Sequence, residues 1–281
     1  MNREKLSLMT FSFGFDILTK KMTIEDSFML PARAGLHYVD VMNVKDEDIS
    51  LYQNAMKKTG VEVYCYICSL SFFSPEDMIR EELDRQFSIA TSLNAKLVMI
   101  VPYKSATDMK TAKKVGRDRT REIMVKGYQL AVEKGREKKM QVCFETTPHD
   151  VLCLSGNDDC KYVLERVPGL GFVFDSANML PHGDKTMEAY ELLKDFIIHV
   201  HLKDVKLEKK WLSYGAECAK DGRVMKVCVW GEGVIPIHEL YKRMVQDGYQ
   251  GNFAIEYAHP PKIPCALEVH EKQLDRYHVW K

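Results

Sequence analysis

Short apolar runs alternate with helical segments along the whole chain, and this alternation limits the folds that the chain can form. Each run is rich in valine, isoleucine and phenylalanine, as expected for a strand that is buried on both faces of a sheet. The eight runs cover residues 6–13, 36–42, 61–67, 96–101, 141–144, 170–174, 197–202 and 253–255. Such a repeated strand-helix pattern predicts a parallel sheet with helices on its outside.

Helical signals fill the segments between these runs. Thr23 and Asp26 have the spacing of a capping box, and Ser74 places an N-cap residue before Pro75. A helix with apolar residues from 79 to 90 is expected after that proline, and others near residues 46–59, 117–138, 158–165, 185–194, 237–246 and 266–277. Because glycine adopts the left-handed conformation easily, helices are expected to end near Gly60, Gly135, Gly169 and Gly248.

The length of the chain fits one closed barrel of eight strand-helix units. It has 281 residues, close to the typical size of about 250 residues for such a barrel. A hydrophobic content of 46% is sufficient for one large core, and no proline-, serine- or glycine-rich linker divides the sequence. We therefore predict a single (β/α)8 TIM barrel domain over residues 1–281, with the active site at the C-terminal ends of the strands.

The composition limits the kinds of molecule that the protein is expected to bind. Lysine and arginine together number 40, as do aspartate and glutamate, so the formal net charge is zero. No overall electrostatic attraction would therefore hold the protein on nucleic acid or on a membrane surface. Eight cysteines without repeated spacing are typical of a reduced, cytoplasmic protein. The N-terminal segment is interrupted by serine, threonine and glycine, which favours a first strand over a secretion signal or a membrane span. The expected partner is a small molecule in the cytoplasm.

Four residues with metal-binding side chains follow or end four of the predicted strands, and they are Glu145, Asp175, His201 and Glu256. They are separated by 30, 26 and 55 residues, so the first two separations match one strand-helix unit and the last roughly two. We expect them to converge, because the strand ends of a parallel barrel share one face. Three carboxylates and one imidazole favour manganese, magnesium or cobalt, with zinc as an alternative. One acid after a strand is more often a helix cap, so the prediction rests on all four together.

Several motifs together resemble the xylose isomerase-like TIM barrels. They are FETTP, FVFDSAN, HVHLKD, WGEGVIPIHEL and YQGNFAIEY, and the resemblance extends over nearly the whole chain. That group contains sugar phosphate isomerases and epimerases, ketose 3-epimerases, inosose dehydratases and endonuclease IV. The resemblance implies a divalent metal ion, with manganese as the expected ion, held by the four residues above. It also implies that Glu145 and Glu256 move protons, and it suggests a homo-oligomer.

Five further residues are candidates for contacting the substrate, namely Asn178, His199, Lys203, Asp204 and Arg223. In relatives with the HLKD run, Lys203 and Asp204 line the barrel mouth, and Lys203 shares a strand face with His201 by alternation. The alternative for Lys203 and Asp204 is an ion pair with each other or with neighbouring loops. His199 lies on the same face, where it either donates to the acids or fills a barrel layer, and we favour the layer.

The chain departs from the ketose 3-epimerase pattern at several positions. Asn178 replaces a histidine, and an amide hydrogen-bonds a hydroxyl but does not titrate near neutral pH. Val151 replaces a substrate-contacting glutamate, and Leu207 replaces an arginine whose charge Arg223 is a candidate to supply. These three differences argue against a ketose 3-epimerase in the strict sense. Asp40, on the second strand, stands where many relatives have glutamate, a conservative change that is compatible with a role in the barrel mouth.

The predicted activity is that of a metal-dependent isomerase or epimerase acting on a sugar or a related polyol-ketone. Removing a proton next to a carbonyl creates an enediolate, which a chelated divalent ion stabilises by on the order of several kcal/mol. An inosose dehydratase-like lyase begins with the same step and is an alternative, as is a non-catalytic sugar-binding barrel. Endonuclease IV-type cleavage needs a trinuclear site rich in histidines, and the third and fourth strands end without one.

Three further features yield smaller predictions. The long connection over residues 203–233, which contains Trp211 and Tyr214, is expected to cover the barrel mouth, with a β-hairpin in VMKVCVW. Cys65 and Cys68 are expected on opposite faces of one strand, as structural cysteines. His259, in the loop after Glu256, is a candidate for reaching the pocket.

Overall fold

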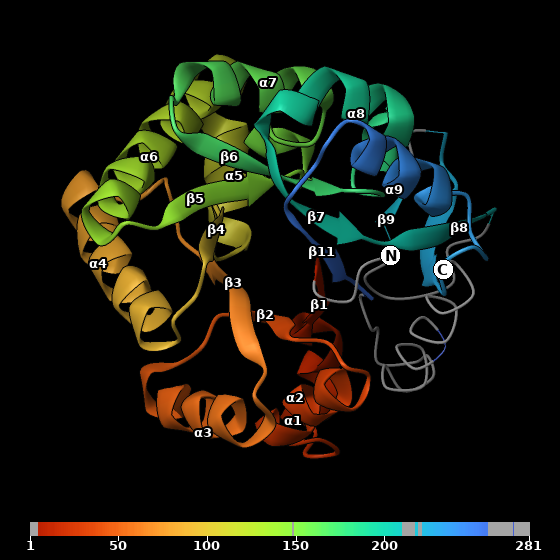
Figure 1. Ribbon diagram of the computed structural model, residues 1–281. Coiled ribbons are helices and arrows are strands. Elements are labelled where there is room, and N and C mark those ends of the chain that lie inside the picture. Colours follow the sequence, from red (N-terminus) through yellow and green to blue (C-terminus); the bar gives the residue numbers. More distant parts are fainter. Residues whose placement is uncertain (1–4, 148, 210–216, 219–220, 258–271, 273–281) are drawn as a thin grey trace.

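In the computed structural model, eight parallel strands close into a barrel that is surrounded by helices (Figure 1). The structure describes residues 5–147, 149–209, 217–218, 221–257 and 272. In order around the barrel, the strands are β1 (Leu6–Met9), β2 (Tyr38–Met42), β3 (Glu62–Ser69), β4 (Leu97–Val101), β5 (Gln141–Glu145), β6 (Leu170–Asp175), β7 (Ile197–Leu202) and β11 (Asn252–Ile255). Strand β11 pairs with β1 and closes the cylinder. The predicted (β/α)8 barrel and its eight strands are confirmed. Residues 10–13, which were predicted as the end of the first strand, instead form a 3-10 helix.

The helices lie on the outside of the barrel (Figure 1). They are α1 (Gly14–Leu18), α2 (Ile24–Arg33), α3 (Ile49–Thr59), α4 (Glu76–Ser92), α5 (Ala106–Val115), α6 (Arg117–Lys138), α7 (Asn157–Arg166), α8 (Thr186–Leu193) and α9 (Ile237–Gln246). The predicted capping box of Thr23 and Asp26 begins α2. Helix α5 was not predicted, because it buries only Asp108 and Ala112 and therefore lacks an apolar stripe. The helix predicted over 266–277 lies outside the described residues.

The predicted glycine helix ends are partly correct. Gly60 follows α3 in the left-handed conformation, with φ of 73°. Gly135 instead lies inside α6, so this prediction is wrong. A Cβ atom there would lie 2.7 Å from the backbone oxygen of Met140, so a close approach of two backbone segments explains this glycine.

The barrel interior and the space under the helices hold separate apolar clusters. The interior cluster consists of Met9, Cys65, Ile67, Leu97, Met99, Cys143 and Val173. Cys68 belongs to the larger cluster between strands and helices, so Cys65 and Cys68 point to opposite faces of β3, as predicted. The cysteines whose side chains the structure describes are buried.

A shift in strand register sets which side chains of β7 enter the barrel. Phe172 pairs with Ile197 but Val173 pairs with His199, so Ile198 is an extra residue in β7. Its side chain fills the space beside Gly171, where a Cβ atom would lie 2.3 Å from Ile198 Cδ1. After this shift, His199 and His201 lie on the interior face of the barrel.

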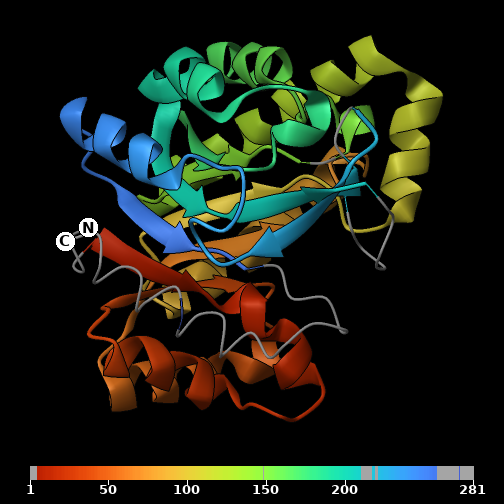
Figure 2. The same ribbon diagram turned by 90° about the vertical axis from the view of Figure 1, so that its right-hand side faces the viewer.

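The connection after β7 forms a small antiparallel sheet. It contains β8 (Asp204–Glu208), β10 (Val224–Cys228) and the two-residue strand β9 (Glu217–Cys218), in the order β8, β10, β9. The predicted hairpin in VMKVCVW is therefore confirmed for β10, while Trp211 and Tyr214 lie outside the described residues. In Figure 2, β8 continues from the C-terminal end of β7.

No helix in the described part of the chain is long and apolar enough to cross a membrane.

Candidate metal centre

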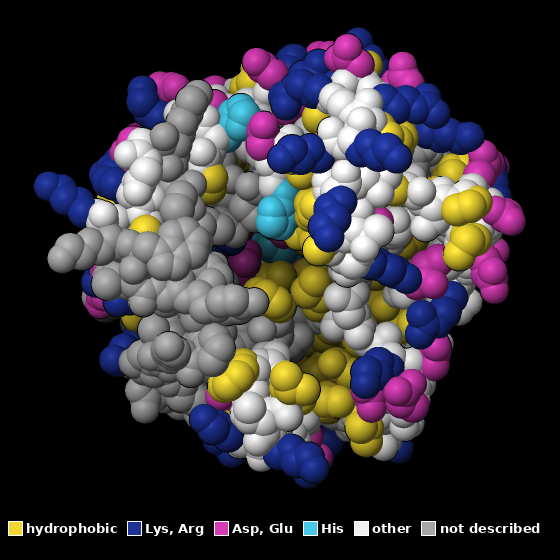
Figure 3. All heavy atoms as spheres, turned by 180° about the vertical axis from the view of Figure 1, so that it is seen from behind, with side chains coloured by type: hydrophobic (Ala, Val, Ile, Leu, Met, Phe, Trp, Pro, Cys, Tyr) yellow, Lys and Arg dark blue, Asp and Glu magenta, His cyan; other side chains and the backbone are white. Residues whose placement is uncertain are grey.

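Four consecutive barrel strands bring the predicted ligands together at one rim. Glu145 and Asp175 are the last residues of β5 and β6, His201 is in β7, and Glu256 directly follows β11. These strands are neighbours in the order β5, β6, β7, β11. One ligand atom from each of the four side chains lies within 4.8 Å of the others. Figure 3 shows this C-terminal face of the barrel, with a hollow near its centre where histidine and acidic side chains are exposed.

His201 lies at the centre of the contacts between the ligands. Its Nδ1 atom is 2.9 Å from Oε2 of Glu145 and 3.4 Å from Oε2 of Glu256. Burial alone would lower the pKa of His201, but the charge of Glu145 and the carboxylate oxygens of Asp40, Glu145 and Glu256 near its ring nitrogens raise it well above its ordinary value. Glu145 is the most accessible of the four, with 17% of its side chain exposed. The carboxylates therefore surround the nitrogen that faces the rim.

Asp175 is fixed by backbone groups on one side and faces the cluster on the other. Its Oδ1 atom accepts hydrogen bonds of 2.7 Å from the backbone N–H groups of Ala177 and Asn178. Burial, with the nearby charges of Glu256 and Glu145, raises the pKa of Asp175 to about 8 although Lys203 opposes the shift. The pKa of Glu256 is lowered, because Lys203 and His201 outweigh the effect of burial. The metal-free cluster thus retains a proton on one of its carboxyl groups near neutral pH.

Lys203 and Asn178, two of the predicted substrate-binding residues, belong to the same cluster. The Nζ atom of Lys203 donates to Oδ1 of Asn178 over 2.8 Å and to Oε1 of Glu256 over 3.1 Å. It also lies 2.9 Å from Oδ2 of Asp175. The amide nitrogen of Asn178 donates in turn to the backbone oxygen of Thr146, over 3.1 Å. A buried cation and an amide therefore line one side of the carboxylate cluster.

The chemistry of these side chains fits a divalent cation. Among the described residues, Oδ2 of Asp175 and Oε2 of Glu256 are buried without an aligned hydrogen-bond donor. Buried carboxylate oxygens of this kind are costly unless a donor or a cation satisfies them. Three carboxylates and one imidazole suit manganese, magnesium or cobalt, and zinc also accepts this set. The residues present can therefore hold one metal ion at the rim.

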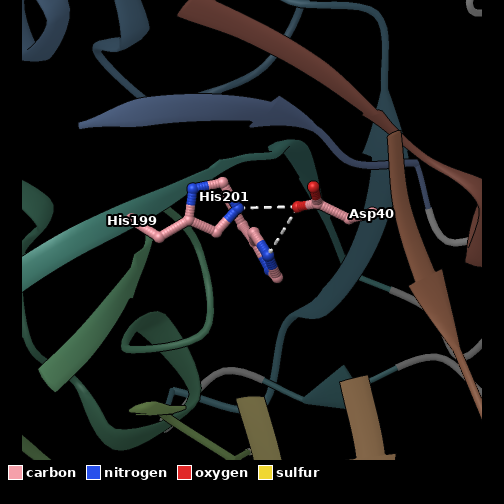
Figure 4. Close-up of side chains that lie close together, drawn as sticks. All are labelled: Asp40, His199 and His201. Carbon is pink, nitrogen blue, oxygen red and sulfur yellow. Dashed lines mark hydrogen bonds and ion pairs between the residues drawn. The ribbon is translucent and has the colours of Figure 1, made fainter. Parts of the chain in front are cut away.

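Asp40 and His199 form a second buried group directly beside His201 (Figure 4). Oδ2 of Asp40 lies 2.6 Å from Nε2 of His199 and 3.6 Å from Nε2 of His201. Burial would raise the pKa of Asp40, but the charge and hydrogen bond of His199, together with the nearby ring of His201, lower it to about 2. His199 fills a barrel layer, as predicted, and also bonds an acid. Sequence analysis noted Asp40 as compatible with a role in the barrel mouth but did not predict it as a ligand or substrate contact. Its even spacing from Tyr38 and Met42 on β2 was a signal that it points inward.

The structure does not bring Asp204 and Arg223 into the cluster. Both carboxylate oxygens of Asp204 accept backbone N–H groups, namely those of Val205, Gly231, Gly233 and Ile235. This carboxylate therefore fixes the WGEG turn. Arg223 is partly exposed and pairs with Asp221 over 2.6 Å. His259 lies outside the described residues.

Two aromatic rings that sequence analysis did not single out lie on the same face. Tyr103 follows β4 and His149 follows β5, and their ring centroids are 5.3 Å apart in an edge-to-face arrangement. Their positions after strand ends were the only signal for them in the sequence.

Comparison with known proteins places the chain among barrels with related folds. An inosose dehydratase of Clostridium botulinum is 20% identical over 269 residues, covering 89% of this chain and 87% of the relative. The structure of the probable 3-DHS dehydratase AsbF from Bacillus anthracis superposes with a TM-score of 0.75 at 14% identity, with 98% of each chain covered.

Two further structures share the fold. The 3-keto-D-glucoside 4-epimerase YcjR from E. coli has a TM-score of 0.66 at 13% identity, covering 99% of this chain and 98% of the other. A xylose isomerase-like TIM barrel protein from Mycobacterium smegmatis, solved in complex with magnesium, has a TM-score of 0.71 at 14% identity, covering 99% and 97%. The model of the xylose isomerase-like TIM barrel family matches residues 26–274. The chain therefore belongs to the xylose isomerase-like TIM barrel family.

Proposed function

We propose that this protein is a divalent-metal-dependent isomerase or epimerase that acts on a sugar or a related polyol-ketone. The observation that carries the proposal is the convergence of Glu145, Asp175, His201 and Glu256 at one rim, with ligand atoms within 4.8 Å of one another. Manganese is the ion proposed, since the set is mostly oxygen with one imidazole. When bound, such an ion polarises the carbonyl group of the substrate and stabilises the negative charge that develops on its oxygen.

The two glutamates are proposed to carry the proton. They come from the outermost of the four strands, so Glu145 and Glu256 flank the arc of ligands while Asp175 and His201 lie between them. One carboxylate takes the proton from the carbon next to the carbonyl, and the other returns a proton to the opposite face or to the adjacent carbon. Their different environments support divided roles, because Glu256 is buried beside Lys203 while Glu145 is partly exposed.

Lys203 and Asn178 are proposed to hold the oxygen atoms of the substrate. The ammonium group of Lys203 donates to the side-chain oxygen of Asn178, so the amide holds this donor next to the carboxylates. A fixed positive charge there stabilises an enediolate oxygen better than water does, because it is oriented before the reaction. Since Lys203 also contacts Glu256, substrate binding exchanges one oxygen partner of the ammonium group for another.

A dehydratase is the second candidate, and two observations favour it. The curated relative described above is an inosose dehydratase, and one superposed structure is a probable 3-DHS dehydratase. Loss of water from the enediolate needs an acid near the departing hydroxyl group, and Lys203 lies 3.1 Å from the proposed base Glu256. The carbon-bound proton then goes to the base, and the hydroxyl group leaves with a proton from the ammonium group.

Proton NMR in deuterated water separates these reactions. The protein is loaded with Mn²⁺ and incubated with a panel of ketoses and inososes, and each substrate is followed for exchange of the proton next to its carbonyl. Exchange with an unchanged hydroxyl count supports isomerisation or epimerisation, whereas loss of water supports the dehydratase. Glu256→Gln is expected to abolish exchange while the fold is kept, because an amide cannot accept the proton.

The control variant is Glu62→Gln. Glu62 begins β3 at the opposite end of the barrel, where it pairs with Lys96 over 3.1 Å, so its replacement should leave exchange unchanged. Retained exchange in Glu256→Gln would exclude Glu256 as the proton carrier. Binding of sugars without exchange of any proton would favour a non-catalytic barrel over both enzyme hypotheses.

A further inference from the structure

We infer that Asp40 is a positioning residue for the metal ligand His201, and that His199 holds Asp40 in place. The inference rests on the metal site of the proposed function. All three side chains are fully buried in the barrel interior, where both imidazole rings point at the same carboxylate oxygen of Asp40 (Figure 4).

The two nitrogen atoms of His201 face different partners. Nδ1 lies 2.9 Å from Glu145 and 3.4 Å from Glu256, on the side of the candidate metal site. Nε2 lies 3.6 Å from Oδ2 of Asp40, and it has no hydrogen-bond partner within the described ranges. A metal ion among the carboxylates therefore meets Nδ1, while Nε2 carries the hydrogen of the neutral ring and points toward Asp40.

His199 is held at both of its nitrogen atoms. Nδ1 lies 3.1 Å from the backbone oxygen of Asn252 and, since a carbonyl oxygen only accepts, this nitrogen donates. Nε2 lies 2.6 Å from Oδ2 of Asp40. The ring of Tyr64 packs at 5.1 Å on one side, and the ring of His201 lies at 5.2 Å and nearly perpendicular. The imidazole of His199 therefore fixes the position of the Asp40 carboxylate.

A carboxylate behind a metal-bound histidine has a defined effect. It orients the ring and makes its other nitrogen a stronger ligand, and loss of such a partner typically weakens metal binding by about 10–100-fold. Asp40 has the position that this role requires, on the side of His201 away from Glu145 and Glu256. Its own backbone oxygen accepts the hydroxyl group of Thr10 over 2.9 Å, so the strand that carries it is also fixed.

The same three side chains also have the composition of a cation site. Ligand atoms of Asp40, His199 and His201 lie within 4.8 Å of one another. A cation there would have to break the 2.6 Å bond between Asp40 and His199 in a fully buried space, which favours the positioning role. The number of metal ions bound per chain distinguishes the two possibilities.

The test is titration of metal-free protein with Mn²⁺ by calorimetry, with the visible spectrum of bound Co²⁺ as a second readout. Asp40→Asn is expected to bind one Mn²⁺ per chain about 10–100-fold more weakly than the unmodified protein, with an altered Co²⁺ spectrum. His199→Gln leaves the carboxylate but loosens it, and it should weaken binding less. Asp159→Asn is the matched control, because Asp159 is equally buried and pairs with Arg117 and Arg121 away from the site.

The outcomes separate this inference from the proposed function. If the unmodified protein binds no divalent ion, the proposed function fails, and the positioning role fails with it. If the unmodified protein binds Mn²⁺ and Asp40→Asn binds it within twofold, only the positioning role is overturned. Two ions per chain, one of them lost in His199→Gln, would also overturn it in favour of a second cation site. If Asp40→Asn does not fold, His199→Gln serves as the test instead. Unchanged Mn²⁺ binding by His199→Gln would then overturn the positioning role.

Discussion

The ammonium group of Lys203 lies 2.9 Å from Oδ2 of Asp175, inside the cluster of carboxylates that fits a divalent ion. It also contacts Glu256, and only 9% of its side chain is exposed. In the metal-free protein, Lys203 therefore compensates part of the negative charge. A bound cation would compete with it for the same oxygen atoms.

Replacing Lys203 with methionine is expected to destabilise the metal-free protein and to strengthen metal binding. Removal of one partner from a buried ion pair costs on the order of 3 kcal/mol, since the remaining charge is left uncompensated. Mn²⁺ should restore much of this loss, because a more negative cluster attracts the ion more strongly. Thermal unfolding with and without Mn²⁺ measures both effects. Lys194→Met, at a partly exposed ion pair with Glu191, is the control, and equal Mn²⁺ stabilisation in both variants would refute the prediction.

The metal-free protein is expected to lose stability as the pH rises from about 5 to about 6.5. The pKa of Asp175 is about 8 in the folded protein against an ordinary value of 3.8, so the folded state binds this proton more tightly than the unfolded state. Its stabilising contribution is complete below pH 3.8 and falls as the pH rises toward the folded pKa, by at most about 1.4 kcal/mol per pH unit. Glu256, whose pKa is lowered, contributes the opposite slope only below its ordinary value.

Urea unfolding of chelator-treated protein at several pH values checks this slope. Asp175→Asn should flatten it in this window, because the amide does not titrate. His201, whose pKa is raised, adds a decrease of the same sign at higher pH, so the comparison is made below about pH 6.5. An unchanged slope in Asp175→Asn would contradict the assignment of the proton to Asp175.

Much of the fold and the convergence of the four ligands could be predicted from sequence, for a geometric reason. Buried parallel strands are continuous apolar runs, and their C-terminal ends share one rim, so residues as distant as Glu145 and Glu256 are expected to meet. The side-chain alternation that placed Lys203 on the same side as His201 also follows from strand geometry. Their metal-binding role remains a prediction.

The partners of individual carboxylates could not be predicted in the same way. Asp204 follows His201 by three residues and has the chemistry of a substrate ligand, yet its oxygens are used by backbone N–H groups of the WGEG turn. These hydrogen bonds depend on the path of the long connection after β7, and no periodic sequence pattern predicts that path. Likewise the pairing of Asp40 with His199 depends on the one-residue register shift at Ile198.

Replacing Asp204 with alanine is expected to destabilise the protein rather than to impair substrate binding. The change leaves four backbone N–H groups without their acceptor, and each buried donor left unsatisfied costs about 1–3 kcal/mol. The free energy of unfolding should therefore fall by about 3 kcal/mol or more, while the affinity for Mn²⁺ stays within about threefold. Asp221→Ala, at an exposed aspartate of the same connection, should change neither quantity. Unchanged stability together with weaker substrate binding would identify Asp204 as a substrate contact instead.

The most direct test of the metal site is anomalous X-ray diffraction from crystals of the protein loaded with Mn²⁺. The expected result is one strong peak per chain at coordination distance, about 2.0–2.4 Å, from Glu145, Asp175, His201 and Glu256. Asp175→Asn should lose this peak or strongly reduce it. A fully loaded crystal with no peak among these four side chains, or with its peak elsewhere, would contradict the metal site and the chemistry proposed from it.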